Sequence, residues 1–296
     1  MIRAASAQRA ANTALGHALG AMPLALRRQV MYAVTHQGRL ANLRSPELFT
    51  HKVNWRMLHD RREILKPTCD KVLMKEIVRE RLGGRIGIPR ILWAGSSLGQ
   101  ARQAPAETWE SPWVLKPAHR SQRIIVGTGA PDIDELMDQT RGWMDQPNWT
   151  VLGEWAYQFA TPRFIFEERL GDGTTLPPDF KFLVFHGVPR FIIVEANRQD
   201  ELTVNYYTPD WVRQEVPVDT PAGPDIPRPR GLDTMLALAA EIAHGFDFLR
   251  VDLYEIDGEI LFGETTPYPV GGLSKYPEWL DRQLGSYWEL PDLANA

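Results

Sequence analysis

The sequence predicts a mixed α+β fold, and two observations carry this prediction. Apolar runs on either side of two-residue turns at His186-Gly187 and Asp257-Gly258 indicate antiparallel hairpins, whereas other stretches have helical spacing. The chain has 296 residues, 44% of them hydrophobic and 24% charged, which suits one large globular domain or two ordinary ones. Helices combined with mostly antiparallel hairpins are typical of the α+β class.

The helical pattern begins clearly at Pro46 and continues to Gly84. Ser45 can cap a first helix there, with Pro46 at its first position, and Thr68 or Asp70 can cap a second. Gly83-Gly84 can end the second helix. The same spacing predicts helices over residues 132–143 and 232–245.

Strands are expected between these helices. Apolar runs predict strands at 86–93, 113–115, 124–126 and 163–170, and two hairpins that span 180–194 and 249–262. Polar or proline-rich composition predicts surface loops at 95–111 and 217–229, and a turn at 171–178.

The net charge of −4 is unevenly distributed along the chain. Residues 1–46 hold six arginines and no acidic residue, so the rest carries 27 basic and 37 acidic side chains, a net charge of −10. Near-helical spacing of Leu15, Leu19, Met22 and Leu26 predicts an amphipathic helix, which Pro23 would interrupt. A packed helix, a contact with an anionic membrane or a partner, and a targeting segment are the alternatives.

Composition also excludes several classes of protein. An acidic body argues against a nucleic-acid partner. The single cysteine, Cys69, excludes an intrachain disulfide and a cysteine metal cluster, and it favours a reducing, cytoplasmic compartment. No run of 18 apolar residues indicates a membrane-spanning helix.

Two lysines stand where an anionic ligand would be useful. Lys116 ends the predicted strand 113–115 and precedes a polar loop, a position suited to holding a phosphate, although a solvated strand end has the same pattern. Lys181 lies between Phe180 and Phe182 in a predicted strand, so it needs a counter-charge or an anion unless its ammonium reaches solvent.

Two carboxylates stand on the arms of the last predicted hairpin. Asp252 and Glu264 could together hold Mg²⁺ against nucleotide phosphates, or be ordinary strand-edge charges. A regular two-residue turn would pair Asp252 with Gly263 and turn Glu264 to the other face. A shared metal therefore requires a three-residue loop or a bulge near Gly263.

These features occur in an order that resembles a known family. The sequence resembles the TupA-like ATP-grasp proteins of teichuronopeptide and other cell-surface polysaccharide pathways over about residues 45–290. The matching stretches are Asn54-Trp55 to Asp60-Arg61, Cys69-Asp70-Lys71 to Gly83, Val114-Leu115-Lys116, Phe166-Glu167-Glu168, Pro178-Asp179-Phe180-Lys181-Phe182, Arg250-Val251-Asp252-Leu253-Tyr254, Phe262-Gly263-Glu264 and Leu284-Gly285-Ser286-Tyr287-Trp288.

The resemblance implies an ATP-grasp fold, in which two α+β subdomains hold ATP between them. The implied division is a helical extension at 1–60, the first two subdomains with the phosphate loop at 61–165, and a last subdomain with the metal site at 166–296. ATP and Mg²⁺ are the implied cofactors.

The resemblance also implies roles for single residues. Lys116 and Lys181 would contact the phosphates, together with His119 and Ser121 of the phosphate loop. The family's loop is glycine-rich, and here both glycines are replaced, so Arg120 and Arg123 could supply charge instead. The other implied ligands are Glu167 and Glu168 beside adenine and ribose, Asp252, Glu264 and Thr266 on Mg²⁺, and Arg198 and Arg250 on the transferred phosphate or a substrate carboxylate.

The implied reaction is ATP-dependent ligation of a carboxylate to an amine through an acylphosphate, on small-molecule or saccharide-linked substrates of cell-surface polysaccharide synthesis. A sugar or alcohol kinase on the same fold is one alternative. A non-catalytic, nucleotide-binding subunit of a polysaccharide assembly complex is the other, since the altered loop departs from the family pattern.

Overall fold

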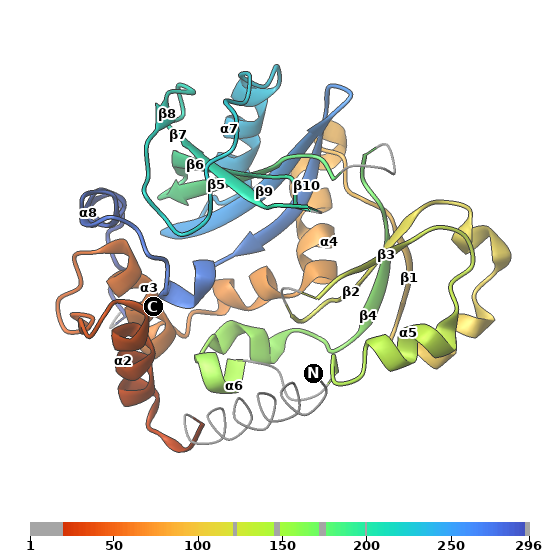
Figure 1. Ribbon diagram of the computed structural model, residues 1–296, viewed down its shortest axis with the longest axis horizontal. Helices are drawn as coiled ribbons and strands as arrows, with labels where there is room; N and C mark the ends of the chain where they lie inside the picture. Colours follow the sequence, from red (N-terminus) through yellow and green to blue (C-terminus); the bar gives the residue numbers. More distant parts are fainter. Residues whose placement is uncertain (1–19, 121–122, 145–148, 172–175, 199, 294–296) are drawn as a thin grey trace.

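Two antiparallel sheets form the framework of the protein (Figure 1). The computed structural model describes residues 20–120, 123–144, 149–171, 176–198 and 200–293. Within these residues the smaller sheet has the order β1 (Ile91–Gly95), β4 (Phe164–Glu168), β2 (Trp113–Pro117), β3 (Ile125–Gly127). The larger has the order β10 (Glu259–Thr266), β9 (Phe248–Ile256), β5 (Asp179–Phe185), β6 (Val188–Ala196), β7 (Thr203–Tyr207), β8 (Arg213–Gln214).

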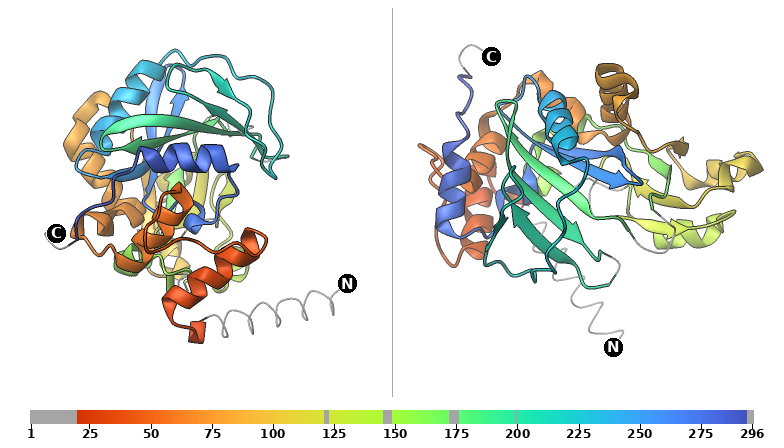
Figure 2. Two further views of the ribbon diagram at one scale, coloured as in Figure 1. Left: turned by 90° about the vertical axis from the view of Figure 1, so that its left-hand side faces the viewer. Right: turned by 90° about the horizontal axis from the view of Figure 1, so that it is seen from above.

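Helices surround the two sheets and lie between them. The α-helices are α2 (Leu24–Thr35), α3 (Phe49–His59), α4 (Lys71–Leu82), α5 (Ile133–Gln139), α6 (Trp149–Leu152), α7 (Leu232–Ile242) and α8 (Glu278–Ser286). Shorter 3-10 turns are η1 (Glu63–Cys69), η2 (Gly83–Arg85), η3 (Leu98–Gln103), η4 (Ala106–Trp109), η5 (Trp155–Phe159) and η6 (Pro269–Gly272). Figure 2 shows α2, α3 and α8 at one end and the smaller sheet at the other. Among the described residues, no helix is both long and apolar enough to cross a membrane.

The larger sheet has one apolar and one charged face. Phe182 pairs with Val251 and joins the main core with Leu232 and Met235 of α7. Since side chains alternate along a strand, the neighbouring pair, Lys181 and Asp252, points to the opposite face. The charged residues therefore gather on the face away from α7.

Helix α4 connects the two sheets. Asp70 caps it by accepting hydrogen bonds from the amides of Val72 and Leu73, and the same carboxylate accepts from the Thr161 amide next to β4. Val72 packs with Ile165 of the smaller sheet, whereas Val78 belongs to the core of the larger sheet. The position of α4 therefore fixes how the two sheets meet.

Most predicted elements are present with shifted ends. The hairpins at His186-Gly187 and Asp257-Gly258 are confirmed, and all four turn residues have positive φ. Three details of the helix and strand predictions are wrong. The first helix starts at Phe49 rather than Pro46, residues 86–90 lie outside β1, and the loop at 95–111 contains two 3-10 turns.

The described part of the arginine-rich segment, residues 20–46, packs against the rest of the fold. Pro23 follows the helical residues Gly20 and Ala21 and precedes the start of α2, so it stands where the helix is interrupted, as predicted. Arg28 of α2 is fully buried. Its guanidinium donates to the Asn54 side chain at 2.8 Å, to the Leu152 carbonyl at 3.0 Å and to the Gly271 carbonyl. Residues 1–19, with Leu15 and Leu19, lie outside the described residues.

Loss of the Arg28 contacts should strongly destabilise the protein. We expect Arg28→Met to lower the free energy of unfolding by about 3 kcal/mol, because it leaves buried carbonyl and amide oxygens without donors. Urea unfolding measures this change. The control is Arg39→Met, whose side chain is 78% exposed and 4.0 Å from Glu278, with an expected change below about 1 kcal/mol. Equal stability of both variants would show that α2 is not anchored through Arg28.

Candidate active site

A row of charged residues crosses the larger sheet. Lys181 of β5 pairs with Asp252 of β9, and Asp252 pairs with Glu264 of β10. The register of the β9–β10 ladder shifts between Phe262 and Glu264, which places a bulge at Gly263. The predicted bulge is therefore confirmed, and both carboxylates lie on the face that carries Lys181.

Gly263 is required at this bulge for steric reasons. A Cβ atom on Gly263 would lie 2.9 Å from the Asp252 carbonyl oxygen and 2.9 Å from the Tyr254 ring. Neither the backbone nor the ring, which lies next to the charged row, can easily give way. The register of the two carboxylates thus depends on a residue without a side chain.

Arg250 joins the two carboxylates. Its guanidinium makes two hydrogen bonds of 2.7 Å to the carboxylate of Asp252, and its Nη2 also donates to Glu264 at 3.1 Å. Burial alone would lower the pKa of Arg250, but the two carboxylates outweigh it and raise that pKa. Burial would likewise raise the pKa of Glu264, but Lys71 and Arg250 hold it at about 2. The carboxylate of Glu264 and the guanidinium of Arg250 are therefore both charged at neutral pH.

The row continues toward β6. The Lys181 ammonium lies 2.6 Å from Asp179 and 3.0 Å from Asp252, with Glu195 at 3.4 Å. These carboxylates offset the effect of burial and raise the pKa of Lys181. Arg198 extends the network, because it reaches Asp179 at 3.4 Å. It also contacts the Tyr254 hydroxyl at 3.4 Å and the Pro177 carbonyl at 2.9 Å.

The smaller sheet carries a second ionic cluster. Lys116 of β2 donates to Glu167 of β4 at 2.7 Å, and Lys75 of α4 approaches the other carboxylate oxygen at 3.0 Å. Burial lowers the pKa of Lys75 to about 8 although Glu167 acts to raise it. Glu168 is the last residue of β4, and its side chain is 42% exposed and lies 3.7 Å from Arg90. The structure thus pairs Lys116 with Glu167 and turns Glu168 toward solvent.

The loop after β2 brings His119 into the interior. His119 is buried, and neither ring nitrogen has a hydrogen-bond partner among the described residues. Burial, with Arg120 and Lys71 nearby, lowers its pKa to about 4, so the ring is neutral. Arg120 donates to the carbonyls of Gly142 and Trp143, which ties the loop to the end of α5. Ser121 lies outside the described residues.

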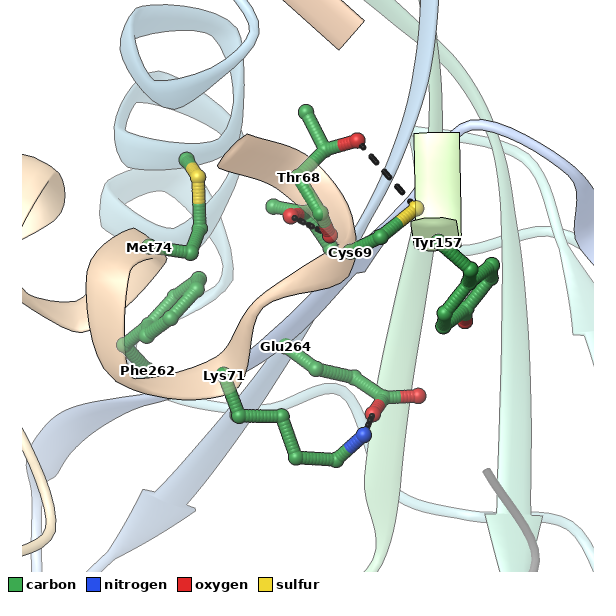
Figure 3. Close-up of a pocket in the computed structure, with 9 residues that line it drawn as sticks. Thr68, Cys69, Lys71, Met74, Tyr157, Phe262 and Glu264 are labelled. Carbon is green, nitrogen blue, oxygen red and sulfur yellow. Dashed lines mark hydrogen bonds and ion pairs between the residues drawn. The ribbon is translucent and has the colours of Figure 1, made fainter. Parts of the chain in front are cut away.

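Sequence reasoning missed Lys71 as a site residue. Lys71 donates to the Arg120 carbonyl in the loop at 2.9 Å. It also lies 3.5 Å from Glu264 of the carboxylate pair (Figure 3). Its position directly after the capping Asp70 was the available signal. Lys75, one helical turn further along α4, was missed as well.

The cavity in Figure 3 has room for about one water molecule. Its volume is about 10 Å³, and its lining includes Cys69, Lys71, Tyr157 and Glu264. Burial raises the pKa of the Cys69 thiol well above its usual value, and its sulfur lies 3.8 Å from the Thr68 hydroxyl. Cys69 is therefore a packed thiol and not a reactive one.

The residues of the row are suited to Mg²⁺ that is also bound by phosphate. Asp252 and Glu264 provide hard carboxylate oxygens on one face, and Thr266, two residues along β10, shares that face. No cluster of three or more histidine, cysteine or acidic side chains in the described part of the chain is placed to hold a metal. A cation here would need further oxygen ligands, which nucleotide phosphates provide.

Two sheets with lysines on each and an acidic pair on the larger one define an ATP-grasp fold. The chain belongs to the TupA-like ATP-grasp family, whose model matches residues 51–289. Both the predicted family and the predicted fold are confirmed, and the match supports the predicted class of enzyme, an ATP-grasp ligase. No protein of curated function matches the sequence.

Several solved structures are similar to this one. The D-alanine–D-alanine ligase from Bacillus anthracis in complex with ATP is 14% identical, with a TM-score of 0.39 over 68% of this chain and 54% of its own. The ATP-grasp ligase PsnB with its minimal precursor is 13% identical, with a TM-score of 0.42 and coverages of 76% and 62%. N5-carboxyaminoimidazole ribonucleotide synthetase with ADP is 16% identical, with a TM-score of 0.44 and coverages of 69% and 46%. The chain thus matches about half of the length of these proteins.

A side chain at Gly263 should destabilise the protein. We expect Gly263→Ala to lower the free energy of unfolding by about 1–3 kcal/mol, because the new methyl group overlaps the Asp252 carbonyl. Gly84→Ala is the control, since open space surrounds that position, and it should change stability by less than about 0.5 kcal/mol. Chemical denaturation distinguishes the two variants. A Gly263→Ala protein as stable as the wild type would mean that the bulge does not need glycine.

Proposed function

We propose that the protein is an ATP-dependent ligase that joins a carboxylate to an amine. The observation that carries this proposal is the Lys181–Asp252–Glu264 row in a chain of the TupA-like ATP-grasp family. The row offers carboxylates for Mg²⁺ beside a lysine for phosphate, which is what transfer of a phosphoryl group requires.

The nucleotide would lie between the two sheets. In the proposed arrangement Lys116, Lys71 and Lys181 contact the phosphates, with His119 and Ser121 in the loop. Glu167 and Glu168 lie toward adenine and ribose. Lys71 and Lys181 are supported by their contacts with the carboxylate pair, and Lys116 by its position on the facing sheet. The division of the chain at residues 60 and 165 is part of this proposal.

Mg²⁺ held by Asp252, Glu264 and Thr266 would neutralise charge on the phosphates. In this proposal Arg250 and Arg198 would contact the transferred phosphate or the substrate carboxylate, and arginine suits both through its planar pair of donors. Arg250 is the stronger candidate for the phosphate, because it already contacts both metal-binding carboxylates.

The reaction would proceed in two steps. An oxygen of the substrate carboxylate attacks the γ-phosphorus of ATP, and ADP leaves with the electrons of the broken P–O bond. The amine nitrogen then attacks the carbonyl carbon of the acylphosphate, inorganic phosphate leaves, and the nitrogen loses a proton to give the amide. We place this reaction in cytoplasmic synthesis of cell-surface polysaccharide, on small-molecule or saccharide-linked substrates.

Nucleotide binding tests the proposal directly. We expect Mg-ADP to bind the wild type in calorimetry and to bind the Asp252→Asn, Glu264→Gln double variant at least about tenfold more weakly, about 1.4 kcal/mol. Glu259→Gln, at the exposed start of the same strand, is the control and should bind as the wild type does. Absence of Mg-ADP binding to the folded wild type would contradict both the ligase and the kinase.

The product then distinguishes a ligase from a kinase. A screen of carboxylates and amines for ADP release, followed by product mass, should find free inorganic phosphate and an amide. Phosphate retained on the product would favour the sugar or alcohol kinase.

We further propose a contact between the outer side of the α2 region and an anionic membrane. Leu26, Val34 and Leu40 are 53%, 80% and 67% exposed, and Arg39 and Arg44 are exposed near them. An open groove of about 730 Å³ lies beside Leu26 and Arg44. Exposed apolar side chains with arginines and no acidic residue up to position 46 suit an anionic lipid surface.

Vesicle sedimentation tests this contact. We expect the protein to sediment with phosphatidylglycerol vesicles, less so with phosphatidylcholine, and several-fold less after Leu26→Glu with Leu40→Glu, because both changes remove apolar contact and add repulsion. Val212→Glu, an exposed apolar position on the larger sheet, is the control. Equal sedimentation of the double variant, or none of the wild type, would contradict the contact.

A further inference from the structure

Every oxygen atom of the two candidate metal-binding carboxylates faces a cationic side chain. Asp252 Oδ1 accepts from Arg250 Nε at 2.7 Å, and Asp252 Oδ2 accepts from Arg250 Nη2 at 2.7 Å and from Lys181 at 3.0 Å. Glu264 Oε1 accepts from Arg250 Nη2 at 3.1 Å, and Glu264 Oε2 lies 3.5 Å from Lys71. Arg250 is the only one of these cations that contacts both carboxylates within the described residues.

The charges of this network are balanced without a metal. Among the described residues, its cations are Lys71, Lys181, Arg198 and Arg250, and its anions are Asp179, Glu195, Asp252 and Glu264. The Asp252 side chain is only 1% exposed, so solvent does little to screen it, whereas the Glu264 side chain is 33% exposed. A divalent cation that entered alone would bring two uncompensated positive charges into a partly buried, neutral cluster.

A cation that enters alone would also have to displace Arg250. The guanidinium would lose both carboxylates, while the metal would find few ligands beyond Asp252 and Glu264 in the part of the chain that the structure describes. A bound nucleotide provides what both Arg250 and the metal lack. Its phosphates supply oxygens to the metal and negative charge to Arg250 and Lys71.

We propose that Arg250 is a counter-ion that prevents free divalent cations from binding to Asp252 and Glu264. Only a metal–nucleotide complex, whose phosphates bind Arg250, can then bind to the two carboxylates. Arg250 thereby determines which form of the ligand the site accepts. The inference rests on the proposed function, because it assumes that the row binds a nucleotide.

Thermodynamic linkage gives the proposal a measurable form. If the phosphates release Arg250 from the carboxylates, ADP must strengthen metal binding, and the metal must strengthen ADP binding by the same factor. Removing Arg250 should make metal binding less dependent on ADP. It should also leave Asp252 and Glu264 as an uncompensated pair that attracts a free cation.

Mn²⁺ is the probe, since the amount that remains free is measured by electron paramagnetic resonance. For the wild type we expect binding of Mn²⁺ alone to be at least about a hundredfold weaker than in the presence of ADP, about 2.7 kcal/mol. For Arg250→Met we expect Mn²⁺ alone to bind at least about tenfold more tightly than to the wild type. Mn²⁺ alone should also raise the unfolding temperature of this variant but not of the wild type.

Arg213→Met is the control. It removes a cation on β8 of the same sheet that contacts Glu215 and Asp225 and no residue of the network, so its Mn²⁺ affinity should stay within about twofold of the wild type. Lys71→Met is the second variant in case Arg250→Met does not fold. It frees one Glu264 oxygen and should strengthen Mn²⁺ binding by a smaller factor.

The outcomes separate this inference from the proposed function. Tight binding of Mn²⁺ alone to the wild type, or no gain in Arg250→Met and Lys71→Met, overturns the counter-ion role even if Mn-ADP binds. Failure of the wild type to bind either Mn²⁺ or Mn-ADP overturns the nucleotide site itself.

Discussion

The candidate active site depends on a one-residue bulge in the last hairpin. Asp252 and Glu264 stand opposite each other because Gly263 adds a residue to one strand, and a side chain at that position would overlap the Asp252 carbonyl. Without the bulge, the period of two residues along a strand would turn Glu264 to the apolar face. Arg250 would then contact one carboxylate of the pair instead of two, and Lys71 would lose its contact with Glu264.

Helix α4 extends this constraint to the second sheet. Asp70 fixes its first turn next to β4, and from there Lys71 reaches Glu264 while Lys75 reaches Glu167. One helix thus brings a lysine to each ionic cluster. The distance between the two clusters is set by the packing of α4 against both sheets, and Arg28 on α2 secures the turn at Gly271 that follows β10.

Short sequence patterns predicted those parts of the structure that depend on residues close together in the chain. Turn residues predicted both hairpins, a cap at Thr68 or Asp70 predicted α4, and the period of two required a three-residue loop or a bulge near Gly263. The sequence did not indicate that Arg28 would be buried, because its partners, Leu152 and Gly271, lie more than 100 residues away along the chain. An arginine-rich helix has the same pattern whether its arginines meet carbonyl groups or solvent.

The sequence also did not indicate which charged residues form ion pairs, because the partners lie far apart along the chain. Lys181 and Asp252 are 71 residues apart, so their contact follows from the order of strands, which hairpins alone do not specify. Arg250 suggested a ligand for phosphate, and its bonds to both carboxylates became visible only in the fold. The role of Lys71 depended in turn on where α4 lies relative to β10.

A crystal structure with Mg²⁺ and a non-hydrolysable ATP analogue tests the central claim most directly. The account predicts Mg²⁺ at about 2.0–2.1 Å from an oxygen of Asp252 and an oxygen of Glu264, bridged to the nucleotide phosphates, with Arg250 turned from the carboxylates to a phosphate. A nucleotide bound away from the Lys181–Asp252–Glu264 row, or a metal bound by phosphates without either carboxylate, would contradict it.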